Sequence, residues 1–207
     1  LTLSHLTNPL DVIDHFITEC GGAKALAGLT TREVCQKFII PKMRESFSHK
    51  AESIPPQRCG GSYVRSMQDD EQLGRGVGEV DIYVIHAWDA NFINMIEALR
   101  YSIEERDPSR VHNTYLWIDM FCMNQCKVYV HSEEWYRKSL KEEISKWVKQ
   151  TIIILSPWDN PILFQRSWCL MEIFFAIHDL ETASEQEDGR KRRDSTLRIN
   201  GQIDDLF

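Results

Sequence analysis

Two carboxylic acids stand at positions where a folded chain could use them for chemistry. Asp119 directly follows the apolar run 114–118, and Glu172 lies in the first turns of a helix predicted from Ser167. An acid at the end of a buried strand is unfavourable unless it is paired or functional. A carboxylate can stabilise a developing positive charge, bind hydroxyl groups or attack carbon. Structural roles are also open to both, because Asp119 can cap the following loop and Glu172 can interact with the helix dipole.

Ring-bearing side chains gather near the ends of the predicted strands. His86 and Trp88 follow the first strand, Phe121 comes just after the second, and Trp158 follows the third. A tryptophan can stack on a planar ring of a ligand, and a histidine can contact a phosphate or a hydroxyl group. The same side chains can instead be part of the core, since the chain has six tryptophans. The candidate substrate-binding residues are therefore His86, Trp88, Asp119, Phe121 and Trp158.

A metal site has little support. Cys122, Cys126 and His131 have a loose metal-like spacing, but it is not a zinc-ribbon pattern, and Cys169 as a fourth ligand would be a guess. Six cysteines are too few for a disulfide scaffold, and several lie in apolar segments, where a reduced cysteine acts as a small hydrophobic residue. We therefore expect a reduced protein without a metal or a cofactor.

An alternation of strands and helices must position these candidates. Short apolar runs predict buried strands at 80–85, 114–118 and 151–155. Helical periodicity predicts helices at 92–103, 132–147 and 167–180. Asp89 is the expected N-cap of the first of these helices. Such alternation is typical of a parallel sheet covered by helices on both faces, in which ligands bind outside the carboxyl ends of the strands. The site is expected at that edge.

Residues 1–78 are predicted to form a helical extension and linker, and residues 79–207 the second unit. Thr30 and Glu33 have the spacing of a capping box, and they begin a helix that Pro41 is expected to end. Residues 46–78 are polar and rich in loop-forming residues. Whether the N-terminal helices dock on the sheet or drive oligomerisation is left open by the sequence. After Leu180 the chain is highly charged, and only 196–199 predicts one more short strand.

Charge and hydropathy exclude several classes of protein. The 207 residues include 24 Lys and Arg against 31 Asp and Glu, which gives a net charge of −7 and argues against the basic face that nucleic-acid binding needs. No apolar run approaches the roughly 18 residues of a membrane span, and the N-terminal segment lacks the pattern of a signal peptide. The chain begins at Leu1, as expected of an excised or processed piece. We expect a cytoplasmic protein with neither nucleic acid nor membrane as a partner.

Three segments, in order, resemble known families. Residues 81–89, Asp-Ile-Tyr-Val-Ile-His-Ala-Trp-Asp, resemble the first strand and turn of Toll/interleukin-1 receptor (TIR) domains. Residues 167–172, Ser-Trp-Cys-Leu-Met-Glu, resemble the Ser-x-Trp-Cys-Leu-x-Glu stretch of plant-type TIR domains. Between them, 116–125 looks like the Trp-Ile-Asp-x-x-Cys-x-Asn-Gln signature of fungal heterokaryon-incompatibility (HET) domains, which are regarded as distant TIR relatives. The resemblance covers residues 78–180.

The resemblance implies an α/β fold of three layers: a flavodoxin-like (TIR-like) parallel sheet with helices on both faces, here preceded by an N-terminal helical extension. The family normally has two further strand–helix units after the third helix. Only one weak strand is predicted there in this chain. The last strands are therefore expected to be short, atypical or truncated.

The resemblance also implies a choice of function. Some TIR domains hydrolyse or cyclise NAD with release of nicotinamide in immune or cell-death signalling, and the Glu of their third helix is the catalytic carboxylate. By position the matching residue is Glu172, with NAD as substrate rather than cofactor. Such catalysis commonly depends on self-association, in which a neighbour's loop completes the pocket. The corresponding loop is 121–131, so a homo-oligomer is expected.

Two alternatives follow from the same resemblance. Other TIR domains only assemble, so the chain could be a non-enzymatic scaffold. A nucleotide sensor that binds without cleaving is the third possibility. A cleft that Glu172 shares with Trp88 or Asp119 would favour catalysis, whereas a Glu172 in bulk solvent would favour the scaffold.

Overall fold

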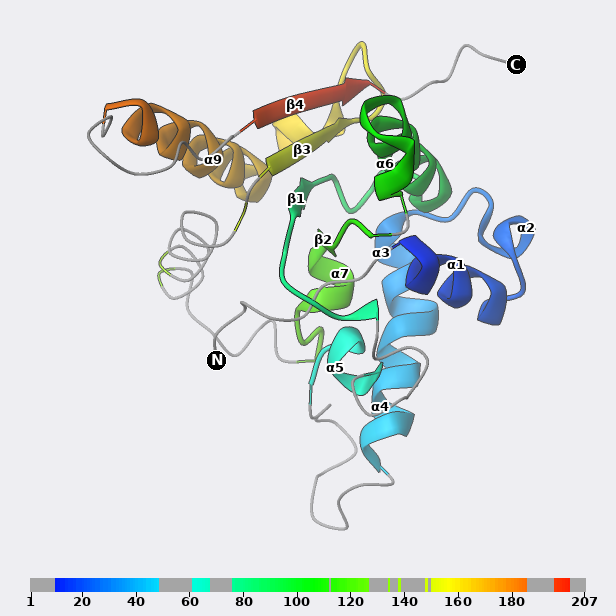
Figure 1. Ribbon diagram of the computed structural model, residues 1–207. Coiled ribbons are helices and arrows are strands. Elements are labelled where there is room, and N and C mark those ends of the chain that lie inside the picture. The colour runs from blue at the N-terminus through cyan, green and yellow to red at the C-terminus, as the bar shows by residue number, and fades with distance from the viewer. Residues whose placement is uncertain are drawn as a thin grey trace.

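Four parallel strands form the sheet at the centre of the computed structural model (Figure 1), which describes residues 10–48, 61–67, 76–111, 113–126, 134, 138, 148, 150–185 and 196–201. Along the sheet the strands follow the order β2-β1-β3-β4. Their bounds are β1 (Ile82–Ile85), β2 (Leu116–Trp117), β3 (Gln150–Leu155) and β4 (Thr196–Gly201). All four predicted strands are confirmed, including the weak one near residue 196.

The central strands are buried because their side chains are apolar on both faces of the sheet. Every residue of β1 is buried, as are all residues of β3 except Leu155. Parallel pairing places Ile82 beside Leu116 on one side and beside Gln150 on the other. The parallel arrangement brings the carboxyl ends of β1, β2 and β3 to one edge of the sheet, as the alternation predicted.

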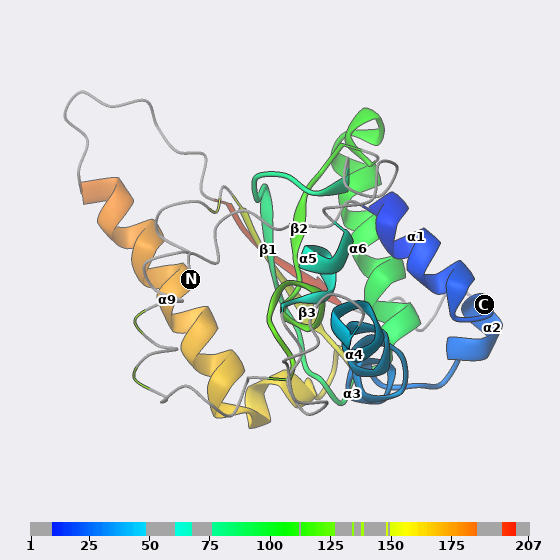
Figure 2. The ribbon, with the colours of Figure 1, turned by 90° about the horizontal axis from the view of Figure 1, so that it is seen from below.

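Two long helices lie on opposite sides of this sheet, as Figure 2 shows. They are α6 (Phe92–Arg106), which follows β1, and α9 (Ser167–Glu185), which follows β3. Between the other elements lie η3 (Pro108–Arg110), α7 (Asp119–Cys122) and η5 (Ile162–Gln165). The protein is therefore an α/β fold with a parallel sheet between helices. The helix predicted at 132–147 falls almost entirely outside the described residues.

The N-terminal helices dock on the rest of the molecule. They are α1 (Leu10–Glu19), α2 (Ala23–Leu26), α3 (Thr31–Val34), η1 (Cys35–Ile39), α4 (Ile40–Ser48) and α5 (Tyr63–Met67). One hydrophobic cluster joins Leu10, Phe16 and Val34 of these helices to Ile85 of the sheet. An ion pair of 2.6 Å between Arg100 and Asp14 also ties α6 to α1. The sequence left open whether these helices dock on the sheet or drive oligomerisation, and the structure shows that they dock.

Pro41 does not end the helix that begins after Thr30, contrary to the prediction. Thr30 caps α3 with the expected capping box, but the helical path continues through η1 into α4. The segment η1 is a π-helix, in which the backbone N–H of Ile40 donates to the carbonyl of Cys35. This wider turn accommodates a proline, which lacks an N–H and would clash with the preceding turn of a regular α-helix.

Asp89 does not cap α6, again contrary to the prediction. The N-cap is Asn91, whose side chain accepts a hydrogen bond of 3.0 Å from the backbone N–H of Asn94. Asp89 instead pairs with two arginines from other elements.

Among the residues that the structure describes, no helix has the length and apolar character needed to cross a membrane.

Candidate functional site

A pocket of about 270 Å³ lies at the carboxyl ends of the strands. The sheet side of its wall consists of Val84, His86, Trp88 and Asp119. The start of α9 and the residue before it contribute Arg166, Trp168, Cys169 and Glu172. The pocket thus lies where the alternation of strands and helices predicted the site, and it holds Glu172 together with both Trp88 and Asp119.

The N-terminal helices supply a third wall of the pocket. Its residues are Arg32, Cys35, Gln36 and Ile40, and the loop after α7 adds Met123 and Gln125. The backbone N–H groups of Thr31 and Arg32 donate to the carbonyls of Ala90 and Trp88, at 3.0 and 2.8 Å. These bonds fix the start of α3 against the loop that follows β1. The π-helical segment η1 therefore lies directly beside the candidate site.

Asp119 is the hydrogen-bonded anion of the pocket. The indole N–H of Trp88 donates to its Oδ2 at 2.6 Å, and Nε2 of His86 lies 2.9 Å from its Oδ1. Burial acts to raise the pKa of Asp119, but the charge and hydrogen bond of His86 and the hydrogen bond of Trp88 outweigh it and lower that pKa below its usual value. The side-chain amide of Gln125 donates to the Asp119 carbonyl at 2.7 Å, which fixes the loop after α7. Asp119 therefore stays ionised at neutral pH.

Glu172 is held in the opposite state. Its side chain is 5% exposed, and the phenol of Tyr83 donates to its Oε1 at 2.5 Å. Burial raises the pKa of Glu172 to about 8, and the charge of Asp119 adds to the rise, while hydrogen bonds from Tyr83 and Trp168 oppose it. At pH 7 the carboxyl group is mostly protonated in the absence of a ligand. A positive charge brought into the pocket would favour its ionised form.

Two cysteines in the pocket wall are not reactive nucleophiles. Burial raises the pKa of the Cys35 and Cys169 thiols to about 12, so neither is a thiolate at neutral pH. The Cys169 thiol donates to the His86 carbonyl at 3.4 Å.

Cys126 is disulfide-bonded, so the expectation that all cysteines are reduced is wrong for that residue.

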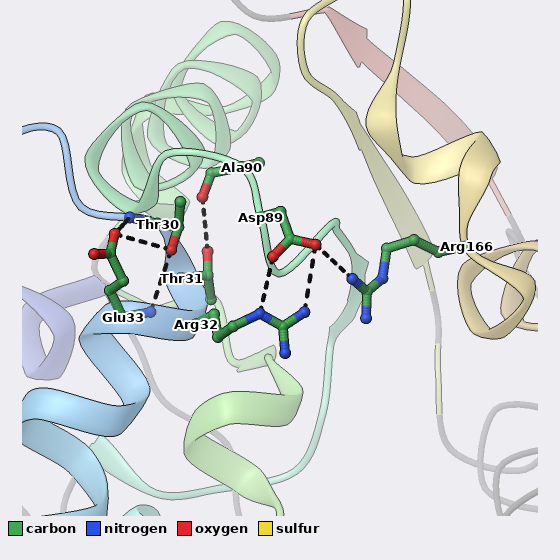
Figure 3. A network of polar contacts seen from close by, with 7 residues as sticks. All are labelled: Thr30, Thr31, Arg32, Glu33, Asp89, Ala90 and Arg166. Atoms are coloured by element: carbon green, nitrogen blue, oxygen red, sulfur yellow. Dashed lines mark hydrogen bonds and ion pairs between the residues drawn. The ribbon is translucent and has the colours of Figure 1, made fainter.

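Two arginines meet one carboxylate at the edge of the pocket. Arg32 donates to Asp89 through Nε at 2.9 Å and through Nη2 at 3.3 Å, and Nη1 of Arg166 donates to Asp89 at 2.6 Å. Figure 3 shows the two guanidinium groups reaching Asp89 from opposite sides. The hydrogen bond from Arg32, with help from Arg166, lowers the pKa of Asp89, so this carboxylate is ionised at neutral pH.

The structure brings four of the six predicted site residues together and leaves two apart. His86, Trp88, Asp119 and Glu172 share the pocket wall. Phe121 is fully buried in an aromatic cluster with Phe16, Tyr63 and Phe92, and is not among the residues that line the pocket. Trp158 is 60% exposed and is also not part of that lining. Phe121 therefore lies in the position of a core residue, and Trp158 lies outside the pocket.

Arg32, Arg166 and Tyr83 are the residues that sequence reasoning missed. Arg32 was assigned to an extension, and its contact with Asp89 joins positions 57 residues apart. Tyr83 reads as one more apolar residue of a buried strand, although its hydroxyl reaches a side chain 89 residues away. Trp168, which comes one residue after the start of α9, also lines the pocket. No local pattern marks these tertiary contacts.

The assembled site can bind a ligand with several hydroxyl groups and stabilise positive charge within it. Asp119 supplies a fixed negative charge, Glu172 a second carboxyl group, and Trp88 and Trp168 apolar ring surface. Among the described residues, no group of three His, Cys, Asp or Glu side chains is placed to hold a metal ion.

Comparison of the chain with protein-family models, with curated proteins and with solved structures gives no match.

Proposed function

We propose that the protein is a TIR-like domain that cleaves NAD at the bond between nicotinamide and ribose, with Glu172 as the reactive carboxylate. The observation that carries the proposal is the pocket at the strand ends, where Glu172 is buried beside Trp88 and Asp119. A glutamate that merely supported a helix terminus would face solvent. Immune or cell-death signalling in the cytoplasm is the corresponding biological role, proposed from the resemblance.

The chemistry requires little acid catalysis. The C1′–N bond breaks with its electron pair going to the ring nitrogen, so nicotinamide leaves as a neutral molecule from a cationic parent. The ribose is left as an oxocarbenium-like species, as in glycoside hydrolysis. Water then adds to C1′ and gives up a proton to a carboxylate or to solvent; addition of a nucleophile from the same molecule would instead close a ring.

The residues of the pocket fit these needs. The positive charge of the nicotinamide ring and then of the ribose favours ionised Glu172, which is mostly neutral before the ligand binds. Asp119 is already ionised and can bind ribose hydroxyls or stabilise the same charge. Trp88, which donates to Asp119, offers a ring surface for nicotinamide or adenine.

The strand order supports the finer description of the fold. The order β2-β1-β3-β4 equals the first four positions of the flavodoxin-like order 2-1-3-4-5. A TIR-like sheet with one strand after the third helix agrees with this order. Self-association remains part of the proposal through the resemblance, so turnover is to be measured at high protein concentration.

Nicotinamide release from NAD tests the proposal. Purified protein is expected to release nicotinamide, and Glu172→Gln and Glu172→Ala are expected to abolish release while the proteins remain folded. Undiminished turnover in either variant would remove Glu172 from the mechanism.

Binding without cleavage is the second candidate, and one observation favours it. The Glu172 carboxyl group is mostly protonated at pH 7 and accepts a hydrogen bond from Tyr83, which is a stable arrangement for a binding residue. A nucleotide sensor would be stabilised against heat by NAD and would release no nicotinamide.

A further inference from the structure

Two carboxyl groups from different elements, Asp119 of α7 and Glu172 of α9, line the same pocket. Both are withdrawn from water, since the side chain of Asp119 is 16% exposed and Glu172 is 5% exposed. Trp88 and His86 hold the charge of Asp119, and that charge opposes a second one on Glu172. The pocket therefore keeps one acid ionised and the other mostly protonated at neutral pH.

The donors that hold Glu172 carry no charge. The phenol of Tyr83 donates to its Oε1 at 2.5 Å, and Trp168 donates a second hydrogen bond to the carboxyl group. Among the described residues, no Lys, Arg or His side chain forms an ion pair with Glu172. An ionised Glu172 thus has hydrogen bonds ready for it but no countercharge.

The basic side chains of the pocket wall are bonded to other carboxylates. Nε of Arg32 and Nη1 of Arg166 donate to Asp89 at 2.9 and 2.6 Å. Nε2 of His86 lies 2.9 Å from Oδ1 of Asp119. A countercharge for Glu172 can be supplied most directly by a ligand.

The other ionisable groups beside Glu172 stay neutral at neutral pH. Burial raises the pKa of Tyr83 well above its ordinary value of 10, and raises those of Cys35 and Cys169 to about 12. Loss of a proton from this side of the pocket near pH 8 therefore belongs to Glu172.

An organic cation is the ligand that such a wall fits. Trp88 and Trp168 each donate a hydrogen bond to one of the two carboxyl groups, and both tryptophans line the pocket. Aromatic rings attract an organic cation, and a positive charge beside a carboxyl group favours its ionised form. The cation would thus receive a second negative charge from Glu172 in addition to that of Asp119.

We propose that the pocket exchanges the proton of Glu172 for an organic cation, and so binds a pyridinium-type ligand more tightly than its neutral counterpart. When the cation enters, the O–H bond of the carboxyl group breaks, its electron pair stays on oxygen, and the proton passes to water and buffer. The choice of a pyridinium ring, as in NAD, rests on the proposed function. In that reaction the nicotinamide that forms is neutral, so Glu172 takes up a proton again and the product is held more weakly than the substrate.

Binding of 1-methylnicotinamide, a permanent cation with no ribose bond to cleave, tests the exchange, with neutral nicotinamide as the matched ligand. Calorimetric titration in buffers of different ionisation enthalpy counts the released protons, and about one proton for each bound cation is expected at pH 7. The affinity for the cation is expected to rise about tenfold for each pH unit up to about pH 8 and then to level. Nicotinamide is expected to release no proton and to gain no affinity over this range.

The variant Glu172→Gln is expected to bind 1-methylnicotinamide without release of a proton. Glu97→Gln, at an exposed position of α6, is the matched control and is expected to release the proton as the wild type does. Proton release that persists in folded Glu172→Gln would overturn the proposal. So would a wild type that binds no 1-methylnicotinamide or binds it without releasing a proton, and that measurement does not depend on how any variant folds.

The two proposals fail in different ways. Proton-linked binding of 1-methylnicotinamide without release of nicotinamide from NAD would keep the exchange and reject the cleavage reaction. Release of nicotinamide from NAD, together with binding of 1-methylnicotinamide that releases no proton, would keep the reaction and reject the exchange.

Discussion

The phenol of Tyr83 on β1 donates a 2.5 Å hydrogen bond to the carboxyl group of Glu172 on α9. The Tyr83 ring is itself stacked on Trp117 of β2, with ring centres 4.7 Å apart. Two neighbouring strands therefore position one carboxyl group of the helix that covers them. In the proposed reaction this hydrogen bond opposes the effect of burial on the pKa of Glu172 and so favours its ionised form.

Removal of that hydrogen bond is expected to shift the pH dependence of NAD cleavage. The bond from Tyr83 lowers the pKa of Glu172, so Tyr83→Phe raises it above about 8. If the ionised carboxylate is the active form, kcat/KM of the wild type rises with pH up to that value and then levels. In Tyr83→Phe the rising limb moves to higher pH, and the rate at pH 7 falls about tenfold for each unit of the shift. Tyr101→Phe, on the exposed side of α6, is the control. An unmoved profile would separate Tyr83 from the ionisation that matters.

The same carboxyl group is expected to make stability depend on pH. Its folded-state pKa of about 8 lies above the ordinary value of 4.5, so the native state keeps a proton that the unfolded chain releases. The free energy of unfolding therefore falls as pH rises from about 4.5 to about 8, by roughly 5 kcal/mol at most. Asp119 has a lowered pKa, so its contribution to stability is constant across this window and is lost only as the pH falls below its ordinary pKa of 3.8.

Urea unfolding of wild type and Glu172→Gln at pH 5 and pH 8 measures this effect. The uncharged glutamine does not titrate, so the variant gains stability relative to the wild type as pH rises. A difference that is the same at both pH values would show that Glu172 is ionised in the native state throughout.

Asp119→Asn is expected to weaken the floor of the pocket. An amide presents only one acceptor oxygen, so it cannot accept a hydrogen bond from Trp88 on one oxygen and face His86 with a second, charged oxygen as the carboxylate does. We expect a loss of about 2–3 kcal/mol in the free energy of unfolding, together with weaker binding of NAD. Asp159→Asn, in an exposed loop, is the matched control. Equal stability of the two variants would contradict the network described for Asp119.

Truncation to alanine is expected to lower the free energy of unfolding far more at Phe121 than at Trp158. Phe121 is enclosed by three aromatic rings, so Phe121→Ala leaves a cavity and costs about 3–5 kcal/mol. Trp158 is largely exposed and outside the pocket, so Trp158→Ala changes stability by about 0.5 kcal/mol or less and leaves the KM for NAD unchanged. Thermal unfolding and nicotinamide release measure both. A raised KM in Trp158→Ala would return that residue to the binding site.

The elements that the sequence predicted well are those with strong local signals. Continuous β-branched runs identify β1 and β3, and the spacing of Thr30 and Glu33 identifies a capping box that the structure contains. The carboxyl-end rule then located the pocket, since it depends only on the alternation of strands and helices. Local energetics decided these features, so local patterns revealed them.

The features that the sequence did not reveal depend on tertiary contacts. A proline in a helical pattern signals an end, but a π-helical turn lets the helix pass Pro41. Aspartate is a common N-cap residue, yet Asp89 forms ion pairs with two arginines from separate elements. To predict that Arg32 and Cys35 line the pocket, one would have to know where α3 and η1 dock. No spacing in residues 1–78 specifies that position.

The most direct test of the central claim compares nicotinamide release from NAD by three proteins at high concentration. They are the wild type, Glu172→Gln, and Glu97→Gln, which makes the same change at an exposed position on α6. The account predicts that the wild type and Glu97→Gln release nicotinamide at equal rates, and that Glu172→Gln is slower by about a hundredfold or more while fully folded. Equal rates in all three proteins, or no release by the folded and self-associated wild type, would contradict it.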